Sequence, residues 1–200
     1  MIIRVRNKIY AAVTPQKCGK TSVLKILAWD KFPNLGADKS ATRKAINDDI
    51  IRPNYYGPGT KKSNKQEYLE VQSVDNIDCM IAFVRDPIER WISAYRDRVL
   101  TKNKNNWQDT SVEYALSRMH QIKKCNFGQH CRPQTVWLGL DPTIYHKVYF
   151  THEINTEFKP MIEKEIGKSI PDIVRNQSEK HPVHLTAEQK EYLKDFYKDD

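Results

Sequence analysis

No apolar run in this sequence approaches the roughly 20 residues that a helix needs to cross a bilayer. The opening residues, 1–8, are too few and too charged to form the apolar region of a secretory signal. Hydrophobic residues make up only 39% of the chain, but its 200 residues suffice for one domain to bury a core without staples. We therefore expect a single domain, 1–200, without a membrane span and located in the cytoplasm.

Cysteines are few, and their spacing along the chain is not that of a metal-binding motif. The four cysteines lie far apart, and no C-x-x-C pair occurs. Cys79 falls in an expected buried strand and Cys18 in an expected loop, so neither fits a disulfide framework. The histidines and cysteines between residues 120 and 131 match no common zinc pattern. We expect no metal site.

Acidic side chains are outnumbered by basic ones. Lys and Arg total 33 against 25 Asp and Glu, which gives a formal net charge of +8. Such a surplus favours anionic partners, among them nucleotides, acidic glycans, nucleic acid and anionic lipid. A merely soluble surface explains the charge equally well. No recognised nucleic-acid motif is present, so a nucleic-acid partner is not expected.

Two short segments are the most informative features of the chain. The apolar run 9–13 leads into the loop Thr14–Ser22, and the apolar run 79–83 leads into Val84–Arg96. Each is typical of a buried strand, a sharp turn and a helix whose opening carries cations and hydroxyl groups. Such a helix start offers unpaired N–H groups and a positive dipole end, which bind phosphate. Two such sites in one small domain indicate a ligand with two phosphate groups.

Strands and helices alternate along the chain. Strands are expected at 8–14, 79–85 and 147–151, and helices at 20–31, 40–49, 86–99, 111–123, 155–165 and 186–197. Asp86 as N-cap, Pro87 at the first helical position and Glu89 mark the clearest helix start. Residues 52–65 are expected to form a mobile basic loop, and 66–74 fit a helix or an edge strand. The pattern predicts an α/β fold: a single P-loop-like domain with a central, mostly parallel β-sheet flanked by helices.

The string Gly19-Lys20-Thr21 resembles the end of a Walker A loop. The full pattern needs glycine at position 14, where this chain has Thr14. Pro15 also sits where an ordinary P-loop curls around a β-phosphate. A P-loop kinase or NTPase that uses ATP and magnesium is therefore disfavoured, and it stays an alternative beside a non-catalytic polyanion-binding protein.

Together the two segments resemble the signature of the sulfotransferases that use 3′-phosphoadenosine 5′-phosphosulfate. In that superfamily a segment of the type Pro-x-Lys-x-Gly-x-Thr-Ser holds the 5′-phosphosulfate, and its places are occupied here by Pro15, Lys17, Gly19, Thr21 and Ser22. A segment of the type Arg-Asp-Pro-x-x-Arg-x-x-Ser-x-Tyr holds the 3′-phosphate, and it is matched here by Arg85, Asp86, Pro87, Arg90, Ser93 and Tyr95. The carbohydrate (Golgi-type) branch is the most similar, because His130-x-Arg132-Pro133-Gln134 follows. Residues 176–182 are similar to the family loop that closes over the nucleotide.

The resemblance implies a role for each matching residue. Lys17 and His130 would be catalytic, Lys17 on the leaving group and His130 as general base. The alternative for His130 is a structural histidine bonded to the backbone, with Asp48, Asp49, Glu67 or Glu70 as the base instead. The donor would be held by Lys17, Cys18, Gly19, Lys20, Thr21, Ser22, Arg85, Ser93, Ser178 and Lys180. The product would be 3′,5′-adenosine bisphosphate, and the side-chain cations make a metal unnecessary. Arg132 and Trp107 would contact the acceptor, although core packing suits Trp107 as well.

The expected acceptor is a hydroxyl group on an acidic or neutral glycan, with lipid, peptide and small-molecule hydroxyls left open. The animal enzymes of this branch carry a membrane anchor that this sequence does not show. We therefore expect a soluble form of bacterial or viral type in the cytoplasm. A location in the Golgi lumen is expected only if an anchor has been removed.

Overall fold

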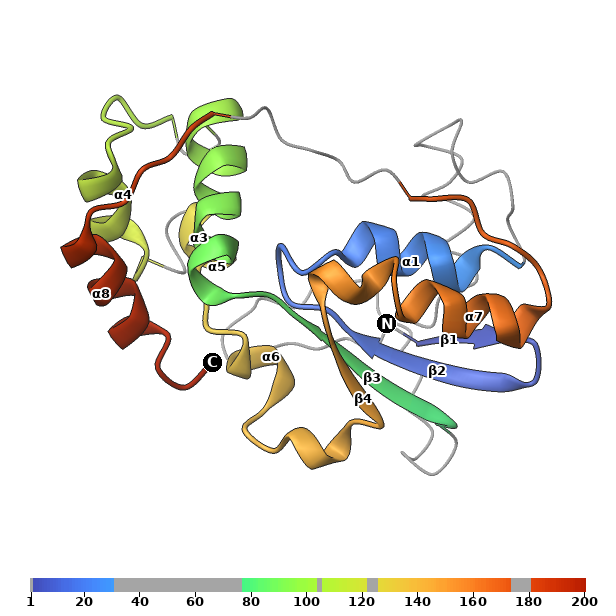
Figure 1. Cartoon of the computed structure of the whole chain (residues 1–200). Coiled ribbons are helices and arrows are strands. Elements are labelled where there is room, and N and C mark those ends of the chain that lie inside the picture. Colours follow the sequence, from blue (N-terminus) through green and yellow to red (C-terminus); the bar gives the residue numbers. More distant parts are fainter. Residues whose placement is uncertain (1, 31–76, 104–105, 122–125, 174–180) are drawn as a thin grey trace, which may run out of the picture. The chain divides into compact units, whose positions relative to one another are not determined.

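The structure is a computed structural model that describes residues 2–30, 77–103, 106–121, 126–173 and 181–200 (Figure 1). The expected helix at 40–49, the basic loop 52–65 and the element at 66–74 lie outside these residues. The chain divides into two compact units, each built from three separate stretches. The sheet unit is drawn from Met1–Thr14, Gly19–Phe83 and Asp141–Val174, and the helical unit from Pro15–Cys18, Val84–Leu140 and Arg175–Asp200.

In its described residues, the sheet unit contains four strands in the order β1-β2-β3-β4. Their bounds are β1 Ile2–Val5, β2 Lys8–Val13, β3 Cys79–Val84 and β4 Lys147–Phe150. Strands β2 and β3 are parallel, with Tyr10 opposite Cys79, and β1 pairs with β2 in antiparallel fashion. The three expected strands and the mostly parallel α/β fold are confirmed. The short strand β1 was not expected.

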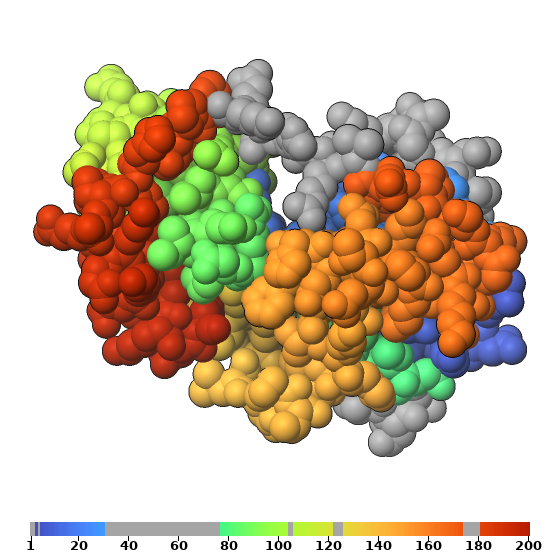
Figure 2. Space-filling model, viewed as in Figure 1, coloured from blue at the N-terminus to red at the C-terminus, as the bar shows by residue number. Residues whose placement is uncertain are grey.

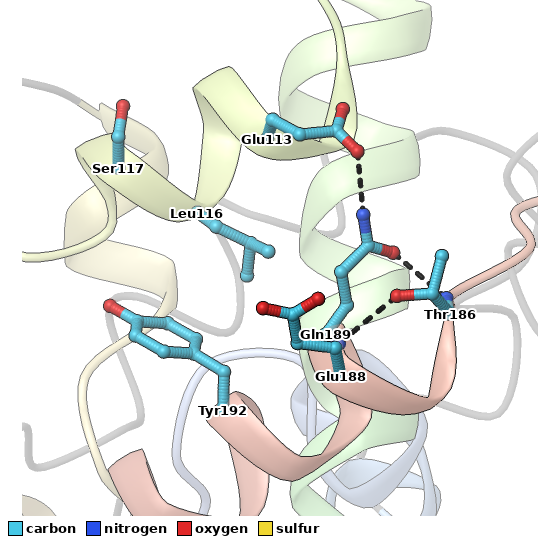
Figure 3. Close-up of a pocket in the computed structure, with 7 residues that line it drawn as sticks. All are labelled: Glu113, Leu116, Ser117, Thr186, Glu188, Gln189 and Tyr192. Carbon is cyan, nitrogen blue, oxygen red and sulfur yellow. Dashed lines mark hydrogen bonds between the residues drawn. The ribbon is translucent and has the colours of Figure 1, made fainter.

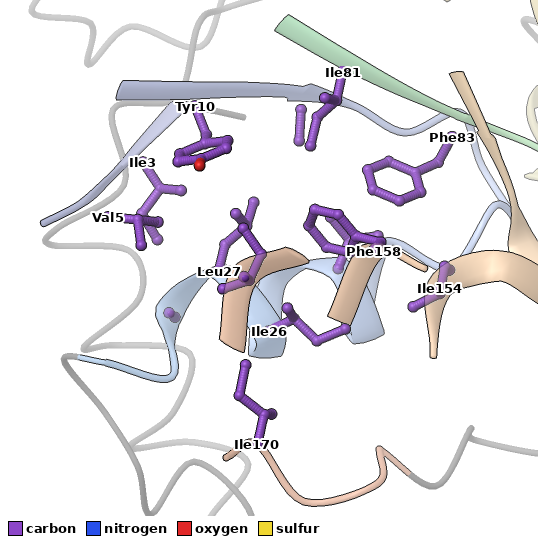
Figure 4. Close-up of a cluster of buried hydrophobic side chains, with 14 of the residues drawn as sticks. Ile3, Val5, Tyr10, Ile26, Leu27, Ile81, Phe83, Ile154, Phe158 and Ile170 are labelled. Carbon is purple, nitrogen blue, oxygen red and sulfur yellow. The ribbon is translucent and has the colours of Figure 1, made fainter. Parts of the chain in front are cut away.

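Two helices of the sheet unit, α1 (Lys20–Ala28) and α7 (Phe158–Ile166), cover one face of the sheet (Figure 4). Both place buried apolar residues toward the strands, three and four positions apart in α1 and four positions apart in α7, as an amphipathic helix does. Ile26 and Phe158 are fully buried, and Phe83 lies edge-on to Phe158 with ring centroids 4.8 Å apart. Short 3-10 turns at Pro142–Ile144 and Thr151–Ile154 flank β4.

The helical unit is built around α3 (Pro87–Tyr95), which continues as a π-helical segment, Arg96–Thr101. Its other helices are α4 (Val112–Arg118), α5 (Asn126–His130), α6 (Thr135–Leu138) and α8 (Ala187–Phe196). The core of this unit is aromatic: Trp91 stacks on Tyr95 at 5.1 Å and meets Phe127 edge-on. The C-terminal segment, red in Figure 2, lies on the outside of α3 and α4. No helix in the described ranges is long and apolar enough to cross a membrane.

Helix starts in this unit follow their sequence signals. The Asp86 carboxylate accepts a hydrogen bond from Glu89 N at 2.8 Å, with Pro87 at the first helical position, as predicted. Thr186 and Gln189 cap α8 reciprocally. Residues 126–130, where no helix was expected, form the five-residue helix α5, whose Phe127 and Gly128 are buried. Burial of that turn, not local propensity, makes it helical.

Candidate functional site

Two of three consecutive residues in the first loop adopt a left-handed backbone conformation. Lys17 has a φ of 68° and Gly19 a φ of 76°, both in the left-handed region. Lys17 is not a glycine, and such strained positions cluster at binding and catalytic sites. The Cys18 N–H donates to the Pro15 carbonyl at 3.2 Å, which closes the turn.

Gly19 is the N-cap of α1, and no side chain caps this helix. A Cβ built on Gly19 would lie 2.4 Å from Cδ1 of Ile154, so the end of the Ile154 side chain would have to shift to admit any larger residue. In the first turn that follows, the side chains of Lys20 and Thr21 are exposed and that of Ser22 is half-buried. A helix start without a side-chain cap, flanked by an ammonium and two hydroxyl groups, can hold an anion.

The Lys17 ammonium lies against the Asp97 carboxylate. The two side chains are only 17% and 12% exposed. Burial lowers the pKa of Lys17, although the hydrogen bond and charge of Asp97 act in the opposite direction. Burial alone would raise the pKa of Asp97, but the hydrogen bonds from Lys102 and Lys17 hold it at about 2. Asp97 is therefore a permanent anion beside the expected catalytic lysine.

Gln134 joins the first loop to the second. Its Oε1 accepts from the Arg85 N–H at 3.0 Å and from the Cys18 thiol at 3.1 Å, and its Nε2 donates to the Arg85 carbonyl at 2.9 Å. The amide thus pairs with Arg85 as a neighbouring strand would. Burial raises the pKa of the Cys18 thiol to about 12, which keeps it protonated as a donor. Within the helical unit, one side chain that is 3% exposed thus links Cys18 to Arg85.

Arg90 is fully buried beneath the His130–Gln134 segment. Its guanidinium donates to the His130 carbonyl at 3.1 Å and to the Arg132 carbonyl at 2.7 Å. It also lies 3.6 Å from the Asp200 carboxylate and over the ring of Tyr197. In the second segment Asp86 caps α3 and Arg85 pairs with Glu89 at the surface. Arg90 is instead a core cation that braces the His130 loop.

His130 is held in one tautomer. Its Nδ1 lies 2.8 Å from the Asn126 carbonyl, an acceptor, so Nδ1 carries the proton and Nε2 has the lone pair. Burial lowers the pKa of His130 to about 4, with Arg98 and Lys17 adding to the shift and the bond to Asn126 opposing it. At neutral pH the ring is a neutral proton acceptor near the Lys17 charge.

The other expected residues fall in different places. Ser93 is half-buried on α3, and the Arg85 side chain forms a 3.4 Å ion pair with Glu89. Trp107 packs edge-on against Tyr114 and Phe127, within the core of the helical unit. Ser178 and Lys180, like the alternative bases between residues 48 and 70, lie outside the described residues. In the described ranges no group of three His, Cys, Asp or Glu side chains is placed to hold a metal ion.

Sequence reasoning missed two polar residues of this site. Gln134 ends the His130–Gln134 motif, and its place in that motif was the available signal. Asp97 lies four residues beyond Ser93 among alternating charges, a pattern typical of a solvated helix face. Its contact with Lys17 spans 80 positions in the sequence and follows only from the fold.

A groove of about 440 Å³ lies between α4 and α8 in the helical unit (Figure 3). Gln189 donates to Glu113 at 2.7 Å across it. Its walls are formed by Glu113, Leu116, Ser117, Thr186, Glu188, Gln189 and Tyr192. None of the residues expected to bind donor or acceptor lines this groove.

A sequence model described as "Sulfotransferase family" matches residues 6–139, more than half of the chain. The match takes in both loops and the His130–Gln134 segment, while residues 176–182 lie beyond it. No curated protein and no solved structure matched the chain.

Proposed function

Since the chain belongs to the sulfotransferase family, we propose that it moves a sulfuryl group from 3′-phosphoadenosine 5′-phosphosulfate to a hydroxyl group of a carbohydrate. The observation that carries this proposal is the Gln134 amide, which bonds to Cys18 in the first loop and to Arg85 in the second. Two anion-binding loops fixed to one side chain suit a ligand that carries phosphate at two positions.

The donor would be held by residues of both loops. The first turn of α1, which no side chain caps, offers backbone N–H groups around Gly19 to Thr21 and the Thr21 hydroxyl to the 5′-phosphate. The Ser22 N–H donates to the Gly19 carbonyl at 2.9 Å, so Ser22 would contribute through its hydroxyl group. Arg85 and Ser93 would hold the 3′-phosphate, with Arg85 exchanging its ion pair with Glu89 for the ligand. Cys18 contributes through its backbone, because its thiol is committed to Gln134. Lys20, Ser178 and Lys180 complete the proposed donor set.

Lys17 and His130 would carry the chemistry. The donor supplies an activated sulfuryl group, whose bond to the phosphate breaks as a bond to the acceptor oxygen forms. Lys17 places a positive charge where negative charge accumulates on the departing phosphate. His130 Nε2 takes the proton of the acceptor hydroxyl, and the Asn126 carbonyl stabilises the positive ring that results. Side-chain cations thereby do what a metal does in phosphoryl transfer.

The acceptor is proposed to be a glycan, acidic or neutral. Arg132, half-buried next to the His130 loop, is the residue that would meet an acidic group on it. Trp107 is proposed only as a secondary contact, since its ring is partly used in core packing.

Calorimetry with 3′,5′-adenosine bisphosphate and, separately, with ATP and magnesium tests the donor. We expect binding of the bisphosphate and none of comparable strength for ATP. Tight ATP binding without bisphosphate binding would overturn the proposal in favour of a kinase or NTPase.

Transfer of labelled sulfate to a panel of glycans, lipids and peptides tests the reaction and the acceptor together. Lys17→Ala and Arg85→Ala should each abolish transfer, whereas Lys198→Ala, at a 69% exposed side chain two residues beyond the end of α8, should leave it unchanged. His130→Ala should lower turnover by a factor of about 10²–10⁴, the usual contribution of a general base. Near-normal turnover in that variant would show that another group is the base.

A further inference from the structure

The strongest unexplained feature of the helical unit is the crowding of cations around Asp97. Lys17 and Arg98 both approach Oδ2, Arg98 with its Nε at 3.1 Å, and Lys102 approaches Oδ1 at 2.5 Å. One carboxylate therefore serves three cations, and the cluster has a net charge of +2. Asp97 is 8% exposed, so its carboxylate is largely shielded from water, and of the three cations only Lys102, at 47%, is substantially exposed.

Unlike the carboxylate of an isolated ion pair, Asp97 keeps other cationic partners when Lys17 moves away. Breaking a buried pair is normally costly because it strands a charge without a partner. Asp97 would keep Arg98 and Lys102, so its carboxylate stays neutralised. Lys17 can thus be given up at little cost to the carboxylate.

The backbone around both partners is also unusual. Asp97 is the second residue of the π-helical segment Arg96–Thr101, a geometry that is rare and often found at functional sites. Lys17 sits in the left-handed region. Two uncommon backbone conformations, far apart in sequence, bring one ammonium to one carboxylate.

We propose that Asp97 is a positioning residue that holds the Lys17 ammonium in the donor-free protein and releases it to the oxygens of the incoming donor. This inference rests on the proposed function, in which Lys17 acts on the leaving phosphate. Asp97 stands in for that phosphate: it keeps the partly buried amine charged and already aimed when the donor arrives. The groups that act on Lys17 from the surrounding elements are Asp97, Arg98, Lys102 and His130.

The test replaces Asp97 by its uncharged isostere, Asp97→Asn. The pKa of Lys17 is read from the NMR shift of its 13Cε, assigned by comparison with Lys17→Arg. Without the carboxylate, the proton dissociation constant of Lys17 should rise at least tenfold. The matched control is Asp195→Asn on α8, whose carboxylate is 83% exposed, and it should leave the Lys17 titration unchanged. An unchanged Lys17 titration in Asp97→Asn would overturn the proposal.

Affinity for 3′,5′-adenosine bisphosphate gives a second readout. If Asp97 only stabilised the fold, Asp97→Asn would bind the bisphosphate more weakly, whereas release of Lys17 predicts tighter binding. At pH 6.5, with Lys17 protonated in both proteins, the variant should bind the bisphosphate at least threefold more tightly, because the competing carboxylate is gone. Between pH 8 and 10 its affinity should fall earlier than that of the parent, as Lys17 loses its proton. Weaker binding at pH 6.5 would overturn the release step.

Lys102→Gln, at a side chain that is 47% exposed, tests the release of Lys17 by removing one of the cations that compete with it for Asp97. Removing this cation leaves Asp97 more dependent on Lys17, so bisphosphate affinity should fall. This arm decides the question if Asp97→Asn does not fold. If the parent protein binds no bisphosphate while Asp97→Asn still shifts the Lys17 titration, the holding role is supported and the donor assignment is the part that fails.

Discussion

At Gly19 the backbone has a φ of 76° and passes so near Ile154 that an added Cβ would lie 2.4 Å from its Cδ1. Gly19→Ala should therefore lower the free energy of unfolding by about 2–4 kcal/mol, the sum of left-handed strain and local overpacking. Urea titration followed by circular dichroism measures this loss.

The control for Gly19→Ala is Gly167→Ala at the end of α7. Gly167 has a φ of 66°, but its added Cβ would meet only Nη2 of Arg6 at 3.5 Å, an ordinary contact. This variant should show the strain cost without the steric cost, about 1–2 kcal/mol. Equal losses in the two variants would mean that Ile154 moves aside freely.

His130 predicts a pH dependence of stability. Its pKa is lowered from 6.5 to about 4 in the folded protein, chiefly by burial. Between these values the unfolded chain binds a proton that the folded chain does not, so stability is full above pH 6.5 and falls as the pH drops toward 4. This group alone should remove up to about 3 kcal/mol.

Urea titrations at pH 4.5, 5.5, 6.5 and 7.5 measure that slope. In His130→Asn, whose amide can still donate to the Asn126 carbonyl, the part of the slope due to His130 should vanish. His184→Gln, at an exposed side chain, should keep it. A parent and a His130→Asn variant with the same slope would show that the ring is protonated in the folded protein.

On the scale of elements, Gln134 replaces a missing strand neighbour at the end of β3. Gln134→Ala leaves the Arg85 N–H, the Arg85 carbonyl and the Cys18 thiol without their partner. We expect a loss of about 2–4 kcal/mol, since each buried group left unpaired costs about 1–3 kcal/mol and some gain water. Thermal and urea unfolding measure it.

The comparison for Gln134→Ala is Gln189→Ala, at a glutamine that caps α8 on the surface and donates to Glu113. That change should cost about 0.5–1 kcal/mol, because water replaces the lost partners. Similar losses in both variants would argue that the Gln134 bonds add little.

The elements that the sequence predicted share one property: their signals are local. The apolar run before each loop and the cap at Asp86 lie within a few residues of what they determine, and the strands β2 and β3 and the helix α3 follow from them. Strand β1 and helix α5 depend instead on distant partners. Ile2–Val5 becomes a strand because β2 offers it an edge, and 126–130 becomes helical because Trp91 and Tyr95 bury Phe127.

The candidate site divides in the same way. Residue types that bind phosphate were visible in both loops, since their order along the chain is the signal. The partners of those residues, Asp97 for Lys17 and Gln134 for Cys18, are set by packing between segments 80 and 116 positions apart. A single sequence does not show which residues so far apart along the chain come into contact.

On the scale of the molecule, each unit has its own hydrophobic cluster, yet neither is a continuous piece of chain. The stretches of the two units alternate along the chain, so unfolding one unit would release the ends of the stretches that form the other unit. We therefore expect one cooperative equilibrium transition, in which circular dichroism and tryptophan fluorescence report the same midpoint.

The chain allows each unit to be followed separately. Trp29 packs against the sheet-unit cluster, while Trp91 and Trp107 belong to the helical-unit cluster. Trp137 also belongs to the helical unit. In Trp29→Phe all remaining tryptophans therefore lie in that unit, and the fluorescence reports on it alone. Its midpoint should match that of the whole chain by circular dichroism. Two separated midpoints would show that the units unfold independently.

The π-helical turn at Arg96–Thr101 makes chain length, rather than residue identity, a determinant of the site. An α-helix rotates by about 100° for each residue, so deleting Arg96, the first residue of this turn, would let α3 run on as a regular helix and swing Asp97 and everything after it around the helix axis. The carboxylate at position 97 would then point away from the first loop even with every side chain of the site still present. A change of spacing here should therefore be tolerated far less well than most substitutions on the same turn.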